Sequence, residues 1–250
     1  QKDGYRFLME KEIFEPHKVL LETMMGRVSD EFIGFEDVGG EFFDGIEEIT
    51  ICACGTSYHA GLSAKYLLER LAKVRTNVVF ASEFRYAQPV MHKNELFVCI
   101  SQSGETADTL EALKLAKTNG LKTLAICNVD NSSIVRESDR TILTRAGIEK
   151  GVASTKAFAT QVMVLWILSV YLGHLRGHIC AQDFKHHAKT MLNATKLTKV
   201  ENQLHDRVKR LSKRNLHGHG FFFIVGDIVY PLALEGALKL KEISYLHAEG

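Results

Sequence analysis

Short apolar runs alternate with longer amphipathic segments between residues 48 and 144. Continuous runs of apolar and β-branched residues are typical of parallel strands buried on both faces, and the amphipathic segments between them are typical of helical crossovers. The pattern therefore predicts an α/β fold, a doubly wound five-stranded parallel sheet flanked by helices. The expected strands are residues 48–54, 77–82, 95–101, 121–129 and 140–144, and the expected helices are residues 60–73, 106–120 and 132–138.

Two further helices are expected after the sheet. Residues 154–175 are largely apolar, so this helix belongs in the core or in a dimer interface. Residues 181–212 predict a second, more charged helix. Within the sheet region, Gly120 is placed to end a helix as a C′ glycine, and Ser132 and Ser133 are placed to cap the next helix.

The β-then-α pattern restarts near the end of the sequence. Residues 211–220 read as a linker, 221–226 as a strand and 231–248 as a helix. A lone βα unit cannot bury its own apolar faces, so we expect a fragment of a longer protein. The expected regions are an N-terminal helical lead-in at 1–45, a first domain at 46–212 and the incomplete beginning of a second domain at 213–250.

The amino-acid composition argues against a nucleic-acid-binding or membrane protein. Lys and Arg number 31 and Asp and Glu number 30, a net charge of +1 that gives no overall attraction to nucleic acid or to an anionic membrane. No uninterrupted apolar stretch reaches the roughly 20 residues of a membrane span, and the opening residues lack the apolar core of a signal peptide, so we expect a cytoplasmic protein.

Cysteine and histidine usage gives no sign of a metal or cofactor. The cysteines Cys52, Cys54, Cys99 and Cys127 lie in or beside apolar runs, where free thiols behave as small hydrophobic side chains. Several histidines are close in sequence, but neither a cysteine nor a carboxylate stands beside them at ligand spacing. These histidine groups are His174 with His178, His186 with His187, and His217 with His219.

Two polar loops each follow a predicted strand and open a predicted helix. The first is residues 54–57, Cys-Gly-Thr-Ser, and the second is residues 101–106, Ser-Gln-Ser-Gly-Glu-Thr. Hydroxyls and free backbone N–H groups that meet at the carboxyl ends of strands are suited to an anion such as a phosphate monoester. The loops lack the endings of nucleotide-binding P-loops and dinucleotide folds. The alternative is a pair of ordinary helix caps.

A third candidate is the face of the last predicted helix. Glu235, Lys239 and Glu242 recur at i, i+4 and i+7, a spacing that puts all three on one side. From the spacing alone these residues read as a solvated ladder of ion pairs. The alternative is a general base, because a carboxylate can take up and return a proton.

Together these motifs resemble the sugar isomerase (SIS) domain of the glutamine–fructose-6-phosphate amidotransferase family. The resemblance spans nearly the whole chain, through Cys-Gly-Thr-Ser at 54–57, residues 81–86, 101–110, 124–129, 132–139 and 151–158, and the ending at 234–249. It implies a fructose 6-phosphate or glucosamine 6-phosphate site. The substrate-binding residues implied are Thr56, Ser57, Ser101, Gln102, Ser103, Thr106, Val152 and Ser154. It further implies Glu242 as the base that moves the proton between C1 and C2, with Lys239 and Glu235 close to the sugar.

The resemblance also implies partners and differences. Family members pair as homodimers through their isomerase domains and carry a glutaminase domain on the N-terminal side. The catalytic N-terminal cysteine of the family is missing, because the chain opens with Gln1 and has no cysteine before Cys52. A C-terminal segment with a histidine and a Schiff-base lysine is missing too. We therefore expect this fragment to bind sugar phosphate without turning it over alone.

Two rival functions remain open from the sequence. One is a regulatory SIS module that senses a phosphosugar without chemistry, although the aligned Glu235, Lys239 and Glu242 argue against it. The other is a flavodoxin-like nucleotide-binding domain, which needs an aromatic or acidic partner for the base or ribose that the sequence does not offer.

Overall fold

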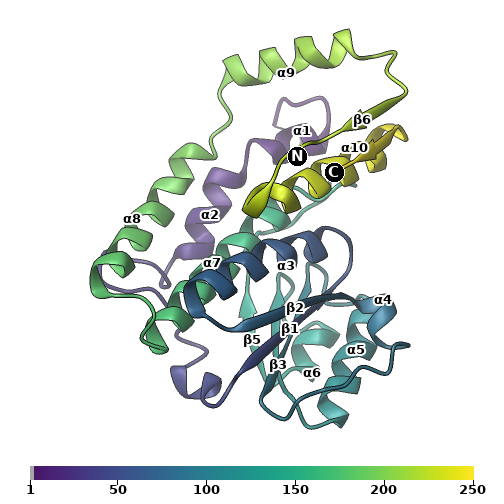
Figure 1. Ribbon diagram of the computed structural model, residues 1–250. Coiled ribbons are helices and arrows are strands. Elements are labelled where there is room, and N and C mark those ends of the chain that lie inside the picture. The colour runs from purple at the N-terminus through teal and green to yellow at the C-terminus, as the bar shows by residue number, and fades with distance from the viewer. Residues whose placement is uncertain (1–2) are drawn as a thin grey trace.

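Five parallel strands form the central sheet of the computed structural model, which describes residues 3–250 (Figure 1). The order across the sheet is β2-β1-β3-β4-β5. The connection from β1 to β2 therefore runs toward one edge of the sheet, and β3, β4 and β5 follow in order toward the opposite edge. The predicted fold class and all five strands are confirmed. The strands are β1 (Glu48–Ala53), β2 (Arg75–Phe80), β3 (Glu95–Ser101), β4 (Lys122–Cys127) and β5 (Arg140–Leu143).

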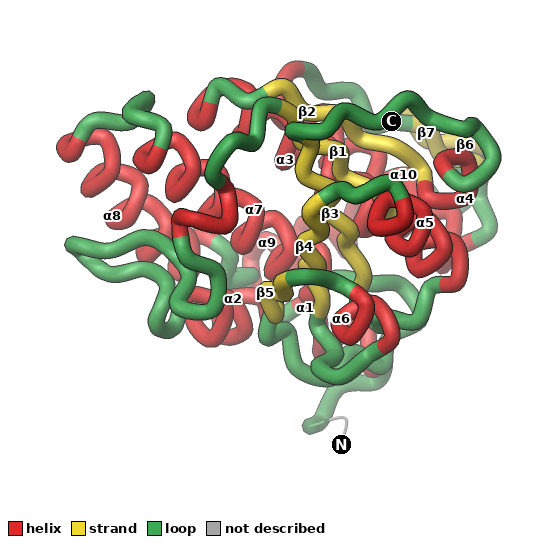
Figure 2. Tube along the Cα trace, turned by 90° about the horizontal axis from the view of Figure 1, so that it is seen from below, coloured by secondary structure: helices red, strands yellow, loops and turns green. Residues whose placement is uncertain are grey.

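Helices cover both faces of this sheet, which is why the central strands β1, β3 and β4 are buried along nearly their whole length, whereas the edge strands β2 and β5 are partly exposed. Every residue of β3 is buried. Phe97 packs in one apolar cluster and its neighbour Val98 in the other, because successive strand residues point to opposite faces. Figure 2 shows α7 and α2 on one side of the strands and α5 and α6 on the other. The helices around the sheet are α3 (Gly55–Leu67) with its π-helical end Leu68–Ala72, α4 (Ala81–Phe84), α5 (Ala107–Thr118), α6 (Ser133–Glu137), α7 (Lys156–Leu175) and α8 (Ala181–Leu197).

Helix α7 lies in the core. It is long and apolar enough to cross a membrane, which corrects our expectation that no stretch reaches that length, but 61% of its most apolar window is buried inside the fold. Leu165, Ile167 and Leu168 are fully buried in the larger apolar cluster. Its composition is therefore explained by packing, as the sequence predicted.

The expected lead-in region packs onto the helices that cover the sheet. Helices α1 (Leu8–Ile13) and α2 (Pro16–Met24) are followed by a 3-10 turn at Gly40–Phe43. Leu20 and Met24 belong to the same apolar cluster as α7. Burial of these residues makes the lead-in part of the folded core.

The caps of two helices can be compared with the predictions. Gly120 follows α5 with a φ of +79°, as expected of a C′ glycine. Ser132 is the N-cap residue of α6, but its side chain does not cap the helix. The Glu105 carboxylate accepts the hydrogen bond of the Ser133 backbone N–H instead, at 2.8 Å, and hydrogen bonds from Ser133 hold the pKa of Glu105 below its ordinary value.

The expected helix 181–212 is wrong as a single element, because it is divided into α8 and α9 (Asn202–Arg214). Helix α8 buries Ala188, Met191 and Thr195, whereas no residue of α9 is buried. After Thr195 the chain leaves the core. The β-branched Thr198 and Val200 then have no packing to offset their weak helix propensity.

The C-terminal segment is a small unit that packs against α3 (Figure 1). Its elements are the strand β6 (Gly220–Phe222), a 3-10 turn at Asp227–Val229, α10 (Tyr230–Ser244) and the strand β7 (His247–Glu249). The expected helix 231–248 ends early, because Tyr245 turns left-handed at φ +57° and β7 pairs in parallel with β6. The expected strand 221–226 is likewise shorter.

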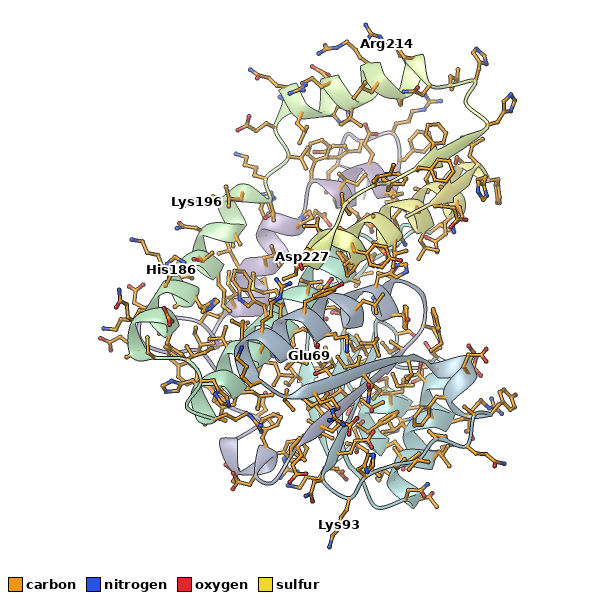
Figure 3. The ribbon with its side chains drawn as sticks, in the orientation of Figure 1. Glu69, Lys93, His186, Lys196, Arg214 and Asp227 are labelled. Carbon is orange, nitrogen blue, oxygen red and sulfur yellow. The ribbon has the colours of Figure 1, made fainter. Side chains whose placement is uncertain are left out.

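An ion pair links the C-terminal segment to the end of α3, and several apolar side chains of this segment are exposed. Arg70, in the π-helical end of α3, pairs with Asp227, which Figure 3 labels between the two regions. Phe222, Ile224 and Tyr245 remain largely exposed. Whether residues 213–250 begin a second domain stays a prediction.

Candidate functional site

A cavity of about 180 Å³ lies where β1 and β3 end. These neighbouring strands form the switch point of the sheet, where ligands of open α/β folds bind. Each strand leads into a helix, α3 or α5, whose first backbone N–H groups face this edge. The cavity is lined by Cys54, Thr56, Ser57, Ile100, Ser101, Gln102, Ser103, Thr106, Thr109, Ser154 and Gln161.

Three serine hydroxyls in this cavity share one hydrogen-bonding arrangement. Ser57 Oγ accepts from the Gln161 side-chain amide at 3.1 Å, Ser101 Oγ from the Gly104 backbone N–H at 2.9 Å, and Ser103 Oγ from the Glu105 N–H at 3.2 Å. A hydroxyl has a single proton to donate, and here the protein occupies an acceptor position of each oxygen. The Ser57 and Ser103 protons are therefore available for a ligand that accepts hydrogen bonds. Ser101 Oγ also lies 3.4 Å from Thr106 Oγ1, where either hydroxyl can donate, so this pair keeps one proton for a ligand.

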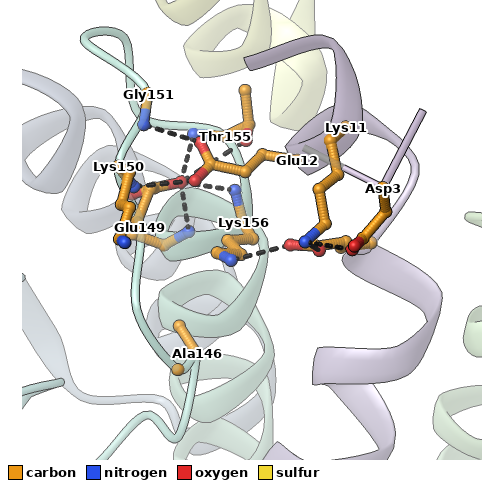
Figure 4. Close-up of polar contacts among 12 residues, drawn as sticks. Asp3, Lys11, Glu12, Ala146, Glu149, Lys150, Gly151, Thr155 and Lys156 are labelled. Carbon is orange, nitrogen blue, oxygen red and sulfur yellow. Dashed lines mark hydrogen bonds and ion pairs between the residues drawn. The ribbon is translucent and has the colours of Figure 1, made fainter. Parts of the chain in front are cut away.

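Ser154 has the opposite arrangement. Its hydroxyl donates to Glu149 Oε2 at 2.7 Å, so only its lone pairs remain for a ligand. The other oxygen, Glu149 Oε1, accepts the backbone N–H groups of Thr155 at 2.8 Å and Lys156 at 3.0 Å, at the first turn of α7 (Figure 4). The Glu149 carboxylate therefore caps α7 and at the same time orients Ser154.

The lead-in helices hold this loop from its other side. Glu12 accepts the backbone N–H groups of Lys150 at 2.7 Å and Gly151 at 2.9 Å, and Figure 4 shows it reaching across from α1. Lys156, whose side chain is 7% exposed, pairs with Glu15 at 2.7 Å. A Cβ at Gly151 would collide with the Glu12 carboxylate, so a side chain there would have to displace Glu12 from the loop. The position of Ser154 therefore depends on α1.

Thr56 joins the cavity to α10. Its hydroxyl donates to Glu235 Oε1 at 2.9 Å and accepts from Lys239 Nζ at 2.9 Å. Lys239 Nζ also lies 3.4 Å from Glu235 Oε1 and 2.7 Å from Glu242 Oε2. His59, one turn after Thr56 on α3, donates from Nδ1 to Glu235 Oε2 at 2.7 Å. The predicted triad is one connected network rather than a solvated ladder, since the Glu235 side chain is only 8% exposed.

Most of the predicted binding residues are brought together. Thr56, Ser57, Ser101, Gln102, Ser103, Thr106 and Ser154 all line the cavity. Val152 does not, because its side chain is 97% exposed and lies outside the lining. Glu242 and Lys239 reach the cavity through Thr56, whose own hydroxyl is already engaged on both sides. The roles of all these residues remain predictions.

Sequence reasoning missed four residues of the site. Gln161 and Thr109 form part of the lining, Glu149 orients Ser154, and His59 holds Glu235. Two signals were available. Gln161 is a rare amide within the apolar stretch of α7, and His59 lies three residues after Thr56, which places both on one face of α3.

A larger hollow of about 610 Å³ lies beside the edge strand β2. Its lining includes the carboxylates Glu48, Glu83 and Glu95, with Lys65 and His92 as the cationic or titratable partners. Three carboxylates repel an anion, and this hollow has no comparable group of hydroxyls. The smaller cavity is therefore the better candidate.

Comparisons with known proteins identify the family of this chain. Residues 45–171 match the SIS domain family. Proteins named glutamine–fructose-6-phosphate aminotransferase (isomerizing) from Helicobacter pylori and Campylobacter jejuni are 58% and 56% identical over 249 and 250 residues. Each alignment covers 100% of this chain but only 42% and 41% of the relative, so the chain spans about two fifths of their length.

Solved structures show the same architecture. The C-terminal domain of glucosamine-fructose-6-phosphate aminotransferase from Francisella tularensis superposes with a TM-score of 0.96 at 43% identity, covering 100% of this chain and 70% of that one. Glucosamine-6-phosphate deaminase from Thermotoga maritima superposes with a TM-score of 0.74 at 21% identity, covering 97% and 69%, and shows likeness of fold alone.

Proposed function

Because the chain belongs to the SIS domain family, within the C-terminal region of the glutamine–fructose-6-phosphate aminotransferases, we propose that its cavity binds fructose 6-phosphate. The chain would then supply the isomerase part of an enzyme that makes glucosamine 6-phosphate from fructose 6-phosphate and glutamine, in amino-sugar biosynthesis. We propose no cofactor for this site.

The observation that carries the proposal is the opposite orientation of the serine hydroxyls. Ser57, Ser103 and the Ser101–Thr106 hydroxyl pair each have a proton to donate, which suits phosphate oxygens that only accept. Ser154 has lone pairs to offer, which suits a sugar hydroxyl that donates. One ligand that carries both groups is a sugar phosphate. The N-termini of α3 and α5 add favourable dipoles for the anion.

The network on α10 supports the chemical role. Glu242 is the proposed base that moves a proton between C1 and C2 of the sugar, and it is the most exposed of the three residues, at 37% of its side chain. Lys239 binds Glu242, Glu235 and Thr56 at once, so it fixes the base relative to the phosphate loop. Glu235, held by His59 and Thr56, anchors the helix.

We expect this chain to bind fructose 6-phosphate and glucosamine 6-phosphate far more tightly than fructose. Isothermal titration calorimetry of the three sugars measures this directly. Ser101→Ala and Ser103→Ala should each weaken sugar-phosphate binding by about 1–2 kcal/mol, the usual effect of losing one hydrogen bond to a charged group. Equal affinity for fructose, or unchanged affinity in both variants, would show that the loops are only helix caps.

We further propose that the protein works in the cytoplasm, beside a glutaminase domain on its N-terminal side, and pairs as a homodimer. Free cysteines support the compartment, because Cys52 and Cys99 are fully buried thiols. Neither nucleic acid nor a membrane is a proposed partner.

The homodimer is proposed only from the resemblance to family members that pair through their isomerase domains, because the exposed Ile224 and Tyr245 lie in the segment that we expect to continue into a second domain. Sedimentation equilibrium should give about twice the chain mass of 28.0 kDa at high protein concentration. A single species of 28.0 kDa across the concentration range would contradict this dimer.

The regulatory alternative has less support. The curated relatives are named as isomerizing aminotransferases, and the buried Glu235 network has no evident use in a sensor. The nucleotide-binding alternative is also weaker, because the cavity lining contains no aromatic or acidic side chain for a base or ribose.

A further inference from the structure

Two buried polar side chains at the cavity are not among the serine hydroxyls described above. Gln161 and Thr109 are each 1% exposed and both line the cavity. Within the described residues 3–250, Gln161 Oε1 and Thr109 Oγ1 have no hydrogen-bond partner. Burying a polar atom without a partner is costly, so such atoms persist where a ligand or water completes them. Their position at a cavity, rather than within the apolar core, points to a ligand.

Gln161 acts on Ser57. Its Nε2 donates to Ser57 Oγ over 3.1 Å, in a buried contact that joins α7 to the start of α3. Because the Gln161 amide donates a hydrogen bond to the Ser57 oxygen, the Ser57 hydroxyl cannot donate its own proton to the same amide. The remaining direction is the cavity, which Ser57 itself lines. Gln161 has little freedom to move away, because its helix neighbours Thr160, Val164 and Leu165 are fully buried.

We propose that Gln161 is a positioning residue for phosphate recognition, fixing the Ser57 hydroxyl as a proton donor toward the bound anion. This inference rests on the proposed function of the same cavity. Gln161 need not touch the phosphate, since its effect passes through Ser57. The unpartnered Thr109 Oγ1 then provides one more hydroxyl that can donate directly to the ligand.

A double-mutant cycle tests the coupling, with fructose 6-phosphate and inorganic phosphate as the calorimetric probes. Gln161→Met keeps the shape of the side chain and removes the amide, and we expect about five- to tenfold weaker binding, the effect of one lost hydrogen bond. Ser57→Ala should weaken binding by at least as much. The combined variant should bind no more weakly than Ser57→Ala alone, because Gln161 acts only through that hydroxyl.

The matched control is Ser169→Ala, which removes another buried hydroxyl from α7, one that bonds only to the Leu165 carbonyl, and should leave affinity unchanged. Circular dichroism shows whether each variant is folded. If Gln161→Met does not fold, Gln161→Glu replaces it, since its carboxylate accepts the Ser57 proton and should weaken binding further.

Two outcomes separate this inference from the proposed function. If the unmodified chain binds neither probe, the proposed function fails. If the unmodified chain binds fructose 6-phosphate while the folded Gln161 variant binds equally well, or if the two substitutions add fully, the positioning role is overturned and the proposed function stands.

Discussion

Replacing Gly104 by alanine should destabilise the protein by about 3–5 kcal/mol, from backbone strain and steric collision together. Gly104 adopts a φ of +67° in the loop after β3, where side chains are disfavoured. An added Cβ would also overlap the Ser132 hydroxyl and lie 2.8 Å from the Cys127 sulfur, both buried. Since neither neighbour has room to move, the loop must shift. Urea unfolding followed by circular dichroism measures the loss.

A glycine with the same backbone conformation gives the control. Gly120 has a φ of +79°, but a Cβ there meets nothing within 4 Å. Gly120→Ala should therefore show the strain alone, about 1–2 kcal/mol. Any Gly104→Ala protein that remains folded should also bind fructose 6-phosphate poorly, because Ser101 and Ser103 flank the shifted residue. Equal stability losses in the two variants would show that Ser132 and Cys127 do not confine this loop.

Glu242→Gln should lower isomerisation of fructose 6-phosphate by about 10²–10⁴-fold, the range typical of losing a general base. The amide keeps the size of the side chain and can still accept the hydrogen bond that Lys239 donates over 2.7 Å. It cannot take up a proton from carbon. Affinity for the sugar phosphate should change little, because Glu242 lies outside the cavity lining. The assay uses the whole gene product, since the chain spans only part of its relatives' length.

Glu69→Gln is the matched control for this experiment. Glu69, labelled in Figure 3, also pairs with a lysine of its own region, Lys65 at 2.9 Å, and is not part of the cavity lining. Its replacement should leave turnover unchanged. Full activity in Glu242→Gln would reject the assigned base, whereas a parallel loss in both variants would indicate a general effect of removing a carboxylate.

The strands were predictable because each one is a short run of apolar and β-branched residues, and the central strands are buried on both faces, as β3 shows at every position. The C-terminal boundaries were not. The early end of α10 depends on β7 pairing with β6, a contact between residues 27 positions apart in the register Gly220 with His247. Secondary-structure propensity depends on residues close in sequence, so it cannot predict such a contact. The break between α8 and α9 depends likewise on where the core ends.

The strand-end loops could be recognised because their hydroxyls are adjacent in sequence. How each hydroxyl is used could not be recognised, because it depends on tertiary partners. Thr56 is engaged by Glu235 and Lys239 from a helix about 180 positions later, and Ser154 is oriented by Glu149. Val152, only two residues before Ser154, faces outward, since neighbouring positions in a loop need not share a surface.

Glu12 and Glu15 hold the loop before α7 through hydrogen bonds and an ion pair. These contacts affect where the protein could be cut into smaller folded pieces. The family match begins at residue 45, yet an excised piece starting there would lack both carboxylates. The Lys150 and Gly151 amides would lose their acceptor, and the nearly buried Lys156 ammonium would lose its counterion. We therefore expect a piece that keeps this loop and its cavity in place to begin before Glu12, well ahead of the border of the family match.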